Sequence, residues 1–100
     1  MFAQAMARVD APGPQQNSST VKAMYFVSAE SDPGLLPRLV EPFAKLGLIP
    51  DRVHADREAH ADRALSVDLR IAGVTPREAD LLERALRTVI GVRSVIVVLD

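Results

Sequence analysis

The 100-residue sequence is 48% hydrophobic and 25% charged and has a net charge of -1, a composition typical of a single globular domain. The absence of cysteine excludes disulfide bonds, cysteine zinc sites and thiol chemistry, and it fits a reducing, cytoplasmic location. The small net charge offers no broad field for nucleic acid or anionic membranes, and no apolar run approaches the roughly 18 to 20 residues of a membrane span.

The composition of residues 1–20 predicts a flexible tail. The stretch from Ala11 to Thr20 is almost entirely Pro, Gly, Gln, Asn, Ser and Thr, which bury too little apolar surface to offset the entropy of ordering. The residues before it lack a basic leader followed by an apolar block, so no signal peptide is expected. We therefore expect one folded domain over residues 21–100.

The domain opens with a strand and a helix. Residues 21–29 are a β-branched and aromatic run without helical spacing, long enough for one largely buried strand. Pro37 and Pro42 predict that the following helix is distorted or starts late, and Gly47 is expected to end it. The stripe of that amphipathic helix recurs at intervals of three and four, at Leu36, Leu39, Val40, Phe43 and Leu46.

Two strands are expected next. Residues 52–58 alternate weakly between apolar and polar side chains, after an opening disturbed by Pro50. Residues 64–72 alternate cleanly, which predicts one core face and one face that is wet or meets a partner. The core face carries Leu65, Val67, Leu69 and Ile71, and the other face carries Ser66, Asp68 and Arg70.

A second helix has signals at both ends. Thr75 and Glu78 form a capping box, Pro76 occupies the first helical position, and Gly91 is expected to stop the helix. Residues 92–100 then predict a final buried strand. The inward stripe of the helix is Ala79, Leu82, Leu86 and Val89, and the i,i+4 ion pairs on it are Asp80/Arg84 and Glu83/Arg87.

The element order βαββαβ predicts the ferredoxin-like α+β fold, a four-stranded antiparallel sheet with both helices on one face. The other face is left bare, and an apolar bare face in so small a domain favours burial by another chain. We therefore expect a homodimer, paired edge to edge or face to face. The strand pattern leaves open which residues lie on the bare face; the candidates are Tyr25, Val27, Arg93, Val95 and Val97.

The turn into the first helix combines an acid, a proline and a glycine. Free backbone N–H groups and the positive end of the helix dipole suit a small anion there, such as the carboxylate of an amino acid, and Gly34 lets it approach. The alternative needs no ligand: Asp32 caps the helix, Pro33 fits its first turn and Gly34 allows close packing.

The stretch SDPGLLPRLVEPFAKLGLI, residues 31–49, resembles the opening half of an ACT domain, a regulatory module of enzymes in amino-acid metabolism. The residues on the family pattern are Pro33, Gly34, Leu35, Leu36, Phe43 and Gly47. The resemblance covers residues 21–100. Among ACT proteins the chain looks most like the small regulatory subunits of acetolactate synthase, which implies a branched-chain amino-acid effector and a catalytic-subunit partner.

The resemblance also implies a ligand site at a dimer seam, formed by the turn and by the loop after the helix. The implied residues are Ser31, Asp32, Gly34, Leu35, Leu36 and Ile49. Members that bind an amino acid have Asn or Asp at the position of Ser31 and Asn at the position of Ile49. Because an isoleucine side chain neither donates nor accepts a hydrogen bond, a subunit that acts by protein contact alone stays open as the alternative.

Other chemistry is not expected. A metal site at His54, Asp56, His60 and Asp62 is conceivable, but no rigid element would fix these residues together, so a solvated hairpin without metal is favoured. We expect no cofactor, no catalytic residue and no enzyme activity. RNA binding is disfavoured because only Tyr25 and Phe26 are aromatic residues of a predicted strand and no RNA-binding motif is present.

Overall fold

The computed structural model describes residues 19–59 and 62–100. The tail expected over residues 1–20 therefore lies almost wholly outside the part of the chain that can be described. Neighbouring strands of the sheet are antiparallel, in the order β2-β3-β1-β4. The elements are β1 (Val21–Ala29), α1 (Leu35–Lys45), β2 (Arg52–Arg57), β3 (Leu65–Val74), α2 (Pro76–Arg87) and β4 (Val92–Leu99).

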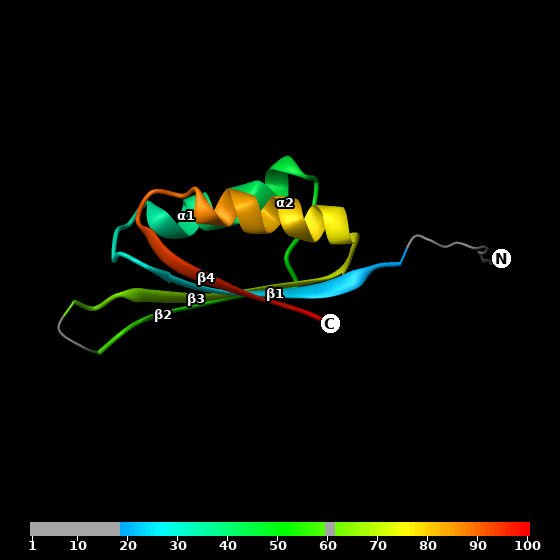
Figure 1. The fold of residues 1–100 in the computed structure, drawn as a ribbon. Helices are drawn as coiled ribbons and strands as arrows, with labels where there is room; N and C mark the ends of the chain where they lie inside the picture. Colours follow the sequence, from blue (N-terminus) through cyan, green and yellow to red (C-terminus); the bar gives the residue numbers. More distant parts are fainter. Residues whose placement is uncertain (1–18, 60–61) are drawn as a thin grey trace.

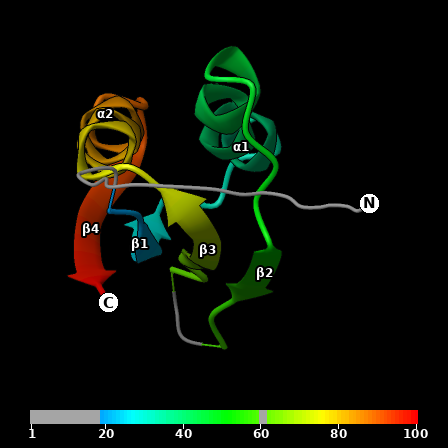
Figure 2. The same cartoon turned by 90° about the vertical axis from the view of Figure 1, so that its right-hand side faces the viewer.

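Both helices lie on one face of the sheet, as Figures 1 and 2 show from two directions. This arrangement confirms the α+β ferredoxin-like fold expected from the element order. The opposite face carries neither helix. We call this surface the bare face. Within residues 19–59 and 62–100, no helix is long and apolar enough to cross a membrane.

The core lies between the sheet and the helices, with Tyr25 of the central strand β1 at its middle. The Tyr25 ring is fully buried and meets the Phe43 ring of α1 edge-on, at 6.4 Å between centroids and 83° between planes. Its hydroxyl donates to the carbonyl of Ala79 in α2 at 2.7 Å. One side chain of β1 therefore contacts both helices, and its buried polar atom is satisfied.

Buried and exposed side chains alternate along β1 and along β4, and this pattern shows which side chains face the helices. Tyr25, Val27 and Val95 are buried under the helices, and Val97 packs partly against the same core. Their assignment as bare-face candidates is wrong. The exposed Arg93 instead forms an ion pair with Asp62 at 2.8 Å.

β4 is also less buried than expected. It is an edge strand, so only one neighbour covers it, and Val95 is its one buried residue among those described. Ile96 and Val98 point to the bare face together with Met24 and Phe26 of β1, which the register pairs with them.

Helix α1 begins at Leu35, directly after Gly34, so it does not start late. Pro37 is its third residue, where the backbone N–H has no intrahelical partner to lose. The helix continues through Pro42 to Lys45 and is capped by Leu46, and the chain then turns at Gly47, whose φ is +72°. There the N–H groups of Gly47 and Leu48 donate to the carbonyls of Ala44 and Phe43 at 3.0 and 2.8 Å, a Schellman cap.

Helix α2 confirms its predicted capping box. The Glu78 N–H donates to Thr75 Oγ1 at 3.1 Å, and the Thr75 N–H donates to Glu78 Oε1 at 2.9 Å. The helix ends at Arg87, earlier than expected, so Gly91 does not stop it. Gly91, with φ of +99°, instead turns the chain into β4. A Cβ atom at this position would lie 2.8 Å from Cδ2 of Leu35, so the turn also requires a close approach.

Candidate functional site

The turn between β1 and α1 forms one side of a hollow of about 410 Å³ at a corner of the domain. Because β1 and β2 are both antiparallel to β3, they run in the same direction, and their C-terminal ends meet beside the start of α1. We call this feature the corner hollow. Its lining residues are Ser31, Asp32, Pro33, Leu36, Arg57 and Leu65.

Asp32 does not cap α1 through its side chain. The cap residue is Gly34, which has α-helical dihedral angles and no side-chain hydrogen bond, and the Asp32 carbonyl accepts from the Leu35 N–H at 3.0 Å. The Asp32 carboxylate instead lies 3.6 Å from the Arg38 guanidinium, with both side chains about half exposed. A Cβ atom on Gly34 would lie 2.6 Å from Arg38 Nη2, so the glycine leaves room for this ion pair.

The six residues implied by the family resemblance do not all meet at the corner hollow. Ser31, Asp32 and Leu36 line it, and Gly34 lies in the same turn. Leu35 is 1% exposed and packs into the core, so its side chain does not line the hollow. Ile49 is 85% exposed at the opposite end of α1, an 11-residue helix that spans about 16 Å. Within one chain, Ile49 and the turn are therefore apart.

Among the residues that line the corner hollow, sequence reasoning placed Leu65 only in the core and missed Arg57. Arg57 is the last residue of β2 and is exposed. The signal was available in principle, because in a βαββαβ fold β1 and β2 run in parallel and their C-terminal ends share one side of the domain. Arg57 supplies a positive group, Asp32 a negative group, and Pro33, Leu36 and Leu65 supply apolar surface. An amino-acid zwitterion has the matching groups: a carboxylate, an ammonium and a side chain.

The charged hairpin between β2 and β3 carries three of the four residues considered as metal ligands within the described part of the chain, His54, Asp56 and Asp62. His54 Nε2 and Asp56 Oδ2 lie 2.8 Å apart on the bare face. Asp62 pairs with Arg93 at 2.8 Å, and hydrogen bonds from the Arg93 side chain and the Ala64 N–H lower the pKa of its carboxyl group. His60 lies outside the described residues. Among the others, no cluster of three or more potential ligands occurs.

Comparison with known families agrees with this fold. A model of the ACT-like domain family matches residues 15–99. The chain belongs to this family, and ACT domains are regulatory modules. Among curated proteins, no sequence matches the chain significantly.

Solved structures with the same fold include domains of three different proteins. The ACT domain of GTP pyrophosphokinase from Chlorobium tepidum is 18% identical, with a TM-score of 0.65 over 80% of this chain and 100% of that domain. The C-terminal domain of MgtC from Mycobacterium tuberculosis is 12% identical, with a TM-score of 0.63 over 87% and 94% of the two chains. The regulatory subunit of aspartate kinase from Thermus flavus is 15% identical, with a TM-score of 0.54 over 78% and 50%. At these identities the likeness concerns the fold alone.

Proposed function

We propose that this protein is a non-catalytic, cytoplasmic regulatory module of amino-acid metabolism that binds an amino acid at the corner hollow. The supporting observation is that one hollow beside the start of α1 is lined by the opposite charges of Arg57 and Asp32 and by the apolar side chains of Pro33, Leu36 and Leu65. The volume of about 410 Å³ falls in the lower part of the usual range for ligand sites, about 300 to 1,000 Å³.

Each group of the ligand has a partner in this proposal. The carboxylate pairs with the Arg57 guanidinium, which can bind it through two parallel hydrogen bonds. The ammonium lies against Asp32, in exchange for part of the Asp32–Arg38 ion pair, which is exposed and therefore weak. The ligand side chain contacts Leu36 and Leu65. Because the apolar lining consists of aliphatic side chains without an aromatic ring to stack on, we expect an aliphatic amino acid to be favoured over an aromatic one.

The finer proposal is a homodimeric small regulatory subunit of acetolactate synthase, which acts on a catalytic partner chain. This step depends on the sequence resemblance of residues 31–49. A gene for a thiamine-dependent synthase next to the gene for this protein would support it. Stable complex formation with that synthase on a sizing column is the direct test, and the separate elution of both chains at micromolar concentration would exclude it.

Thermal unfolding in the presence of each of the twenty amino acids tests the sensor function. A ligand at a hundred times its Kd adds about 2.7 kcal/mol to the free energy of unfolding, which raises the melting temperature of a domain of this size by several degrees. We expect an aliphatic amino acid to produce this shift and Arg57→Gln to abolish it. Arg77→Gln is the matched control, because Arg77 is exposed in α2 and does not line the hollow.

A second candidate function is contact alone, without a small molecule. It is favoured by Ile49, whose exposed apolar side chain stands where amino-acid-binding members have a polar residue. If none of the twenty amino acids shifts the melting temperature, the sensor proposal fails and the contact function stands.

A further inference from the structure

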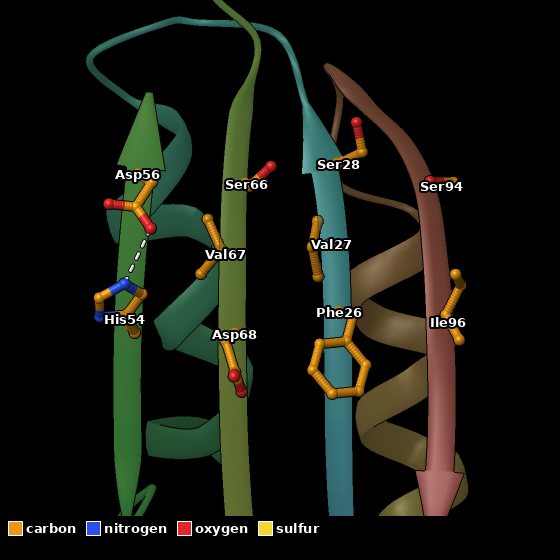
Figure 3. Close-up of a pocket in the computed structure, with 10 residues that line it drawn as sticks. All are labelled: Phe26, Val27, Ser28, His54, Asp56, Ser66, Val67, Asp68, Ser94 and Ile96. Atoms are coloured by element: carbon orange, nitrogen blue, oxygen red, sulfur yellow. Dashed lines mark hydrogen bonds and ion pairs between the residues drawn. The ribbon is translucent and has the colours of Figure 1, made fainter. Parts of the chain in front are cut away.

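The bare face has an apolar half on β1 and β4 and a charged half on β2 and β3, and a row of Ser94, Ser28 and Ser66 crosses from one half to the other (Figure 3). A shallow hollow of about 310 Å³ runs across both halves, with Phe26 and Ile96 at one side and His54 and Asp56 at the other. The apolar half, from β1 and β4, is Met24, Phe26, Ile96 and Val98. The charged half, from β2 and β3, is Arg52, His54, Asp56, Asp68 and Arg70.

The strand register places these side chains in two adjacent rows. In one row, Phe26 lies between Ile96 and Asp68. In the next row, Met24 lies between Val98 and Arg70. Across β3, β1 and β4, each row thus has two apolar residues flanked by one charge, and these two charges are opposite. On β2, the first row ends at His54 and the second at Arg52.

Existing contacts hold the two charges in place. Asp68 accepts two hydrogen bonds from Arg70, both at 2.9 Å, and these bonds lower the pKa of the Asp68 carboxyl group. The Arg70 guanidinium also lies 5.8 Å from the centroid of the Phe26 ring. The rows therefore present an ordered anion and an ordered cation beside the apolar half.

We propose that a second copy of this chain covers the bare face, related by a two-fold axis that crosses the strands between these two rows. This rotation exchanges the rows. Phe26 then faces Met24 of the second copy, Ile96 faces its Val98, and Asp68 faces its Arg70. On β2, His54 faces Arg52 of the second copy, and each of these two side chains keeps its contact with a carboxylate of its own chain, Asp56 or Asp68. Every contact occurs twice, because the interface is the same patch on both copies.

The alternative two-fold axis, parallel to the strands, is disfavoured by the same pattern. It would place β4 of one copy over β2 of the other, so the apolar half would cover Arg52, His54 and Asp56. Burying charges against apolar side chains without new partners is costly. The distribution of charge therefore selects one face-to-face geometry.

The size of the face predicts a weak dimer. Four strands about 4.8 Å apart and roughly seven residues long at 3.4 Å each give a footprint on the order of 450 Å² per copy. The total of about 900 Å² is below that of standard stable interfaces, which bury about 1,200 to 2,000 Å². We therefore expect a dimer that dissociates on dilution through the micromolar range.

Sedimentation of the full chain across a concentration series tests this geometry, which rests on the proposed homodimer. Ile96→Glu places a carboxylate in the apolar half of both copies. Each of the two new carboxylates should cost about 1.4 kcal/mol of binding free energy, which is a tenfold change in Kd. We therefore expect the Kd of the dimer to rise about a hundredfold. Ile90→Glu is the matched control. Ile96 is 62% exposed and Ile90 is 86% exposed, but Ile90 lies in the turn after α2, so its substitution should leave Kd within threefold.

The outcomes separate this inference from the proposed function. Loss of the dimer in Ile96→Glu but not in Ile90→Glu, with unchanged circular dichroism, supports the face-to-face geometry. A dimer that persists in Ile96→Glu overturns this geometry and points to edge pairing, while the homodimer itself stands. A wild-type chain that is monomeric at high micromolar concentration overturns both the face-to-face geometry and the homodimer. The amino-acid melts report on the corner hollow independently of all three results.

Discussion

The titration of Tyr25 offers a quantitative test of how the core is built. Burial of the ring, followed by repulsion from the carboxylates of Glu83 and Asp80 on α2, raises the pKa of Tyr25 from its ordinary value of 10.0 to about 12. Because the folded state holds this proton more tightly than the unfolded state, the associated stability is present below pH 10 and is lost as the pH rises toward 12. At about 1.4 kcal/mol per pH unit, the loss is on the order of 2 to 3 kcal/mol.

Tyr25→Phe isolates this effect. The substitution removes the hydrogen bond to the Ala79 carbonyl, which should cost about 0.5 to 1.5 kcal/mol at neutral pH. It also removes the alkaline loss, so the free energy of unfolding of the variant should fall less steeply above pH 10. Because the alkaline loss of the wild type exceeds the cost of the lost hydrogen bond, the two curves should cross between about pH 10 and 12. All other ionisable groups are common to the two proteins, so the difference between the two curves isolates Tyr25.

Urea unfolding at a series of pH values measures this difference. The chain has one tyrosine and no tryptophan, so the ultraviolet absorbance of tyrosinate reports the same group directly. A tyrosinate midpoint near pH 10, in a chain whose circular dichroism is still native, would refute the buried, hydrogen-bonded position of Tyr25.

Three further substitutions test the core, a turn and a cap, each by urea unfolding at neutral pH. Leu39→Ala in the core should lower the free energy of unfolding by about 2 to 5 kcal/mol, and Leu46→Ala at the C-cap of the same helix, 37% exposed, by much less; equal losses would contradict the burial assigned to Leu39. Gly91→Ala should cost about 1 to 3 kcal/mol and more than Gly47→Ala, because both have positive φ but only Gly91 has a neighbour in the way; the reverse order would count against the Leu35 contact. Thr75→Ala should cost about 1 kcal/mol, and no loss would argue against the capping box.

Local patterns predicted the elements because their signals are local. The capping box at Thr75 and the strict alternation from Leu65 to Ile71 specify a helix start and a strand without reference to the rest of the chain. Gly47 marks the end of α1 in the same way, because the turn there has positive φ.

The side of the sheet that each strand presents was harder to predict, because it depends on pairing between distant residues. In β1, both Tyr25 and Phe26 are large and aromatic, so composition does not distinguish the two faces. The pairing with β3 does: Tyr25 lies opposite Leu69 and Phe26 opposite Asp68. Only the register, which the sequence alone does not reveal, transfers the clear pattern of β3 to its neighbour.

The corner hollow was also hard to predict, because it depends on contacts between residues that are distant in the sequence. The turn was recognised from Pro33 and Gly34, but Asp32 was expected to cap α1 if no ligand was bound. The structure pairs its carboxylate with Arg38, which the space left by Gly34 allows. Arg57 joins the hollow through the parallel course of β1 and β2 and not through any local motif.

The corner hollow and the bare face lie on different sides of the sheet, and this separation leads to a final prediction. Leu65 and Arg57 belong to the face covered by the helices, whereas Phe26 and Ile96 belong to the bare face. Face-to-face pairing therefore leaves both corner hollows open, and it is incompatible with the expected position of the turn from Ser31 to Leu36 at a dimer seam. Binding at one surface should then leave the affinity of the other unchanged, since coupling requires a difference in contacts between states. A saturating amino acid that changes the dimer Kd more than threefold in sedimentation would contradict this independence and favour a seam built around the turn.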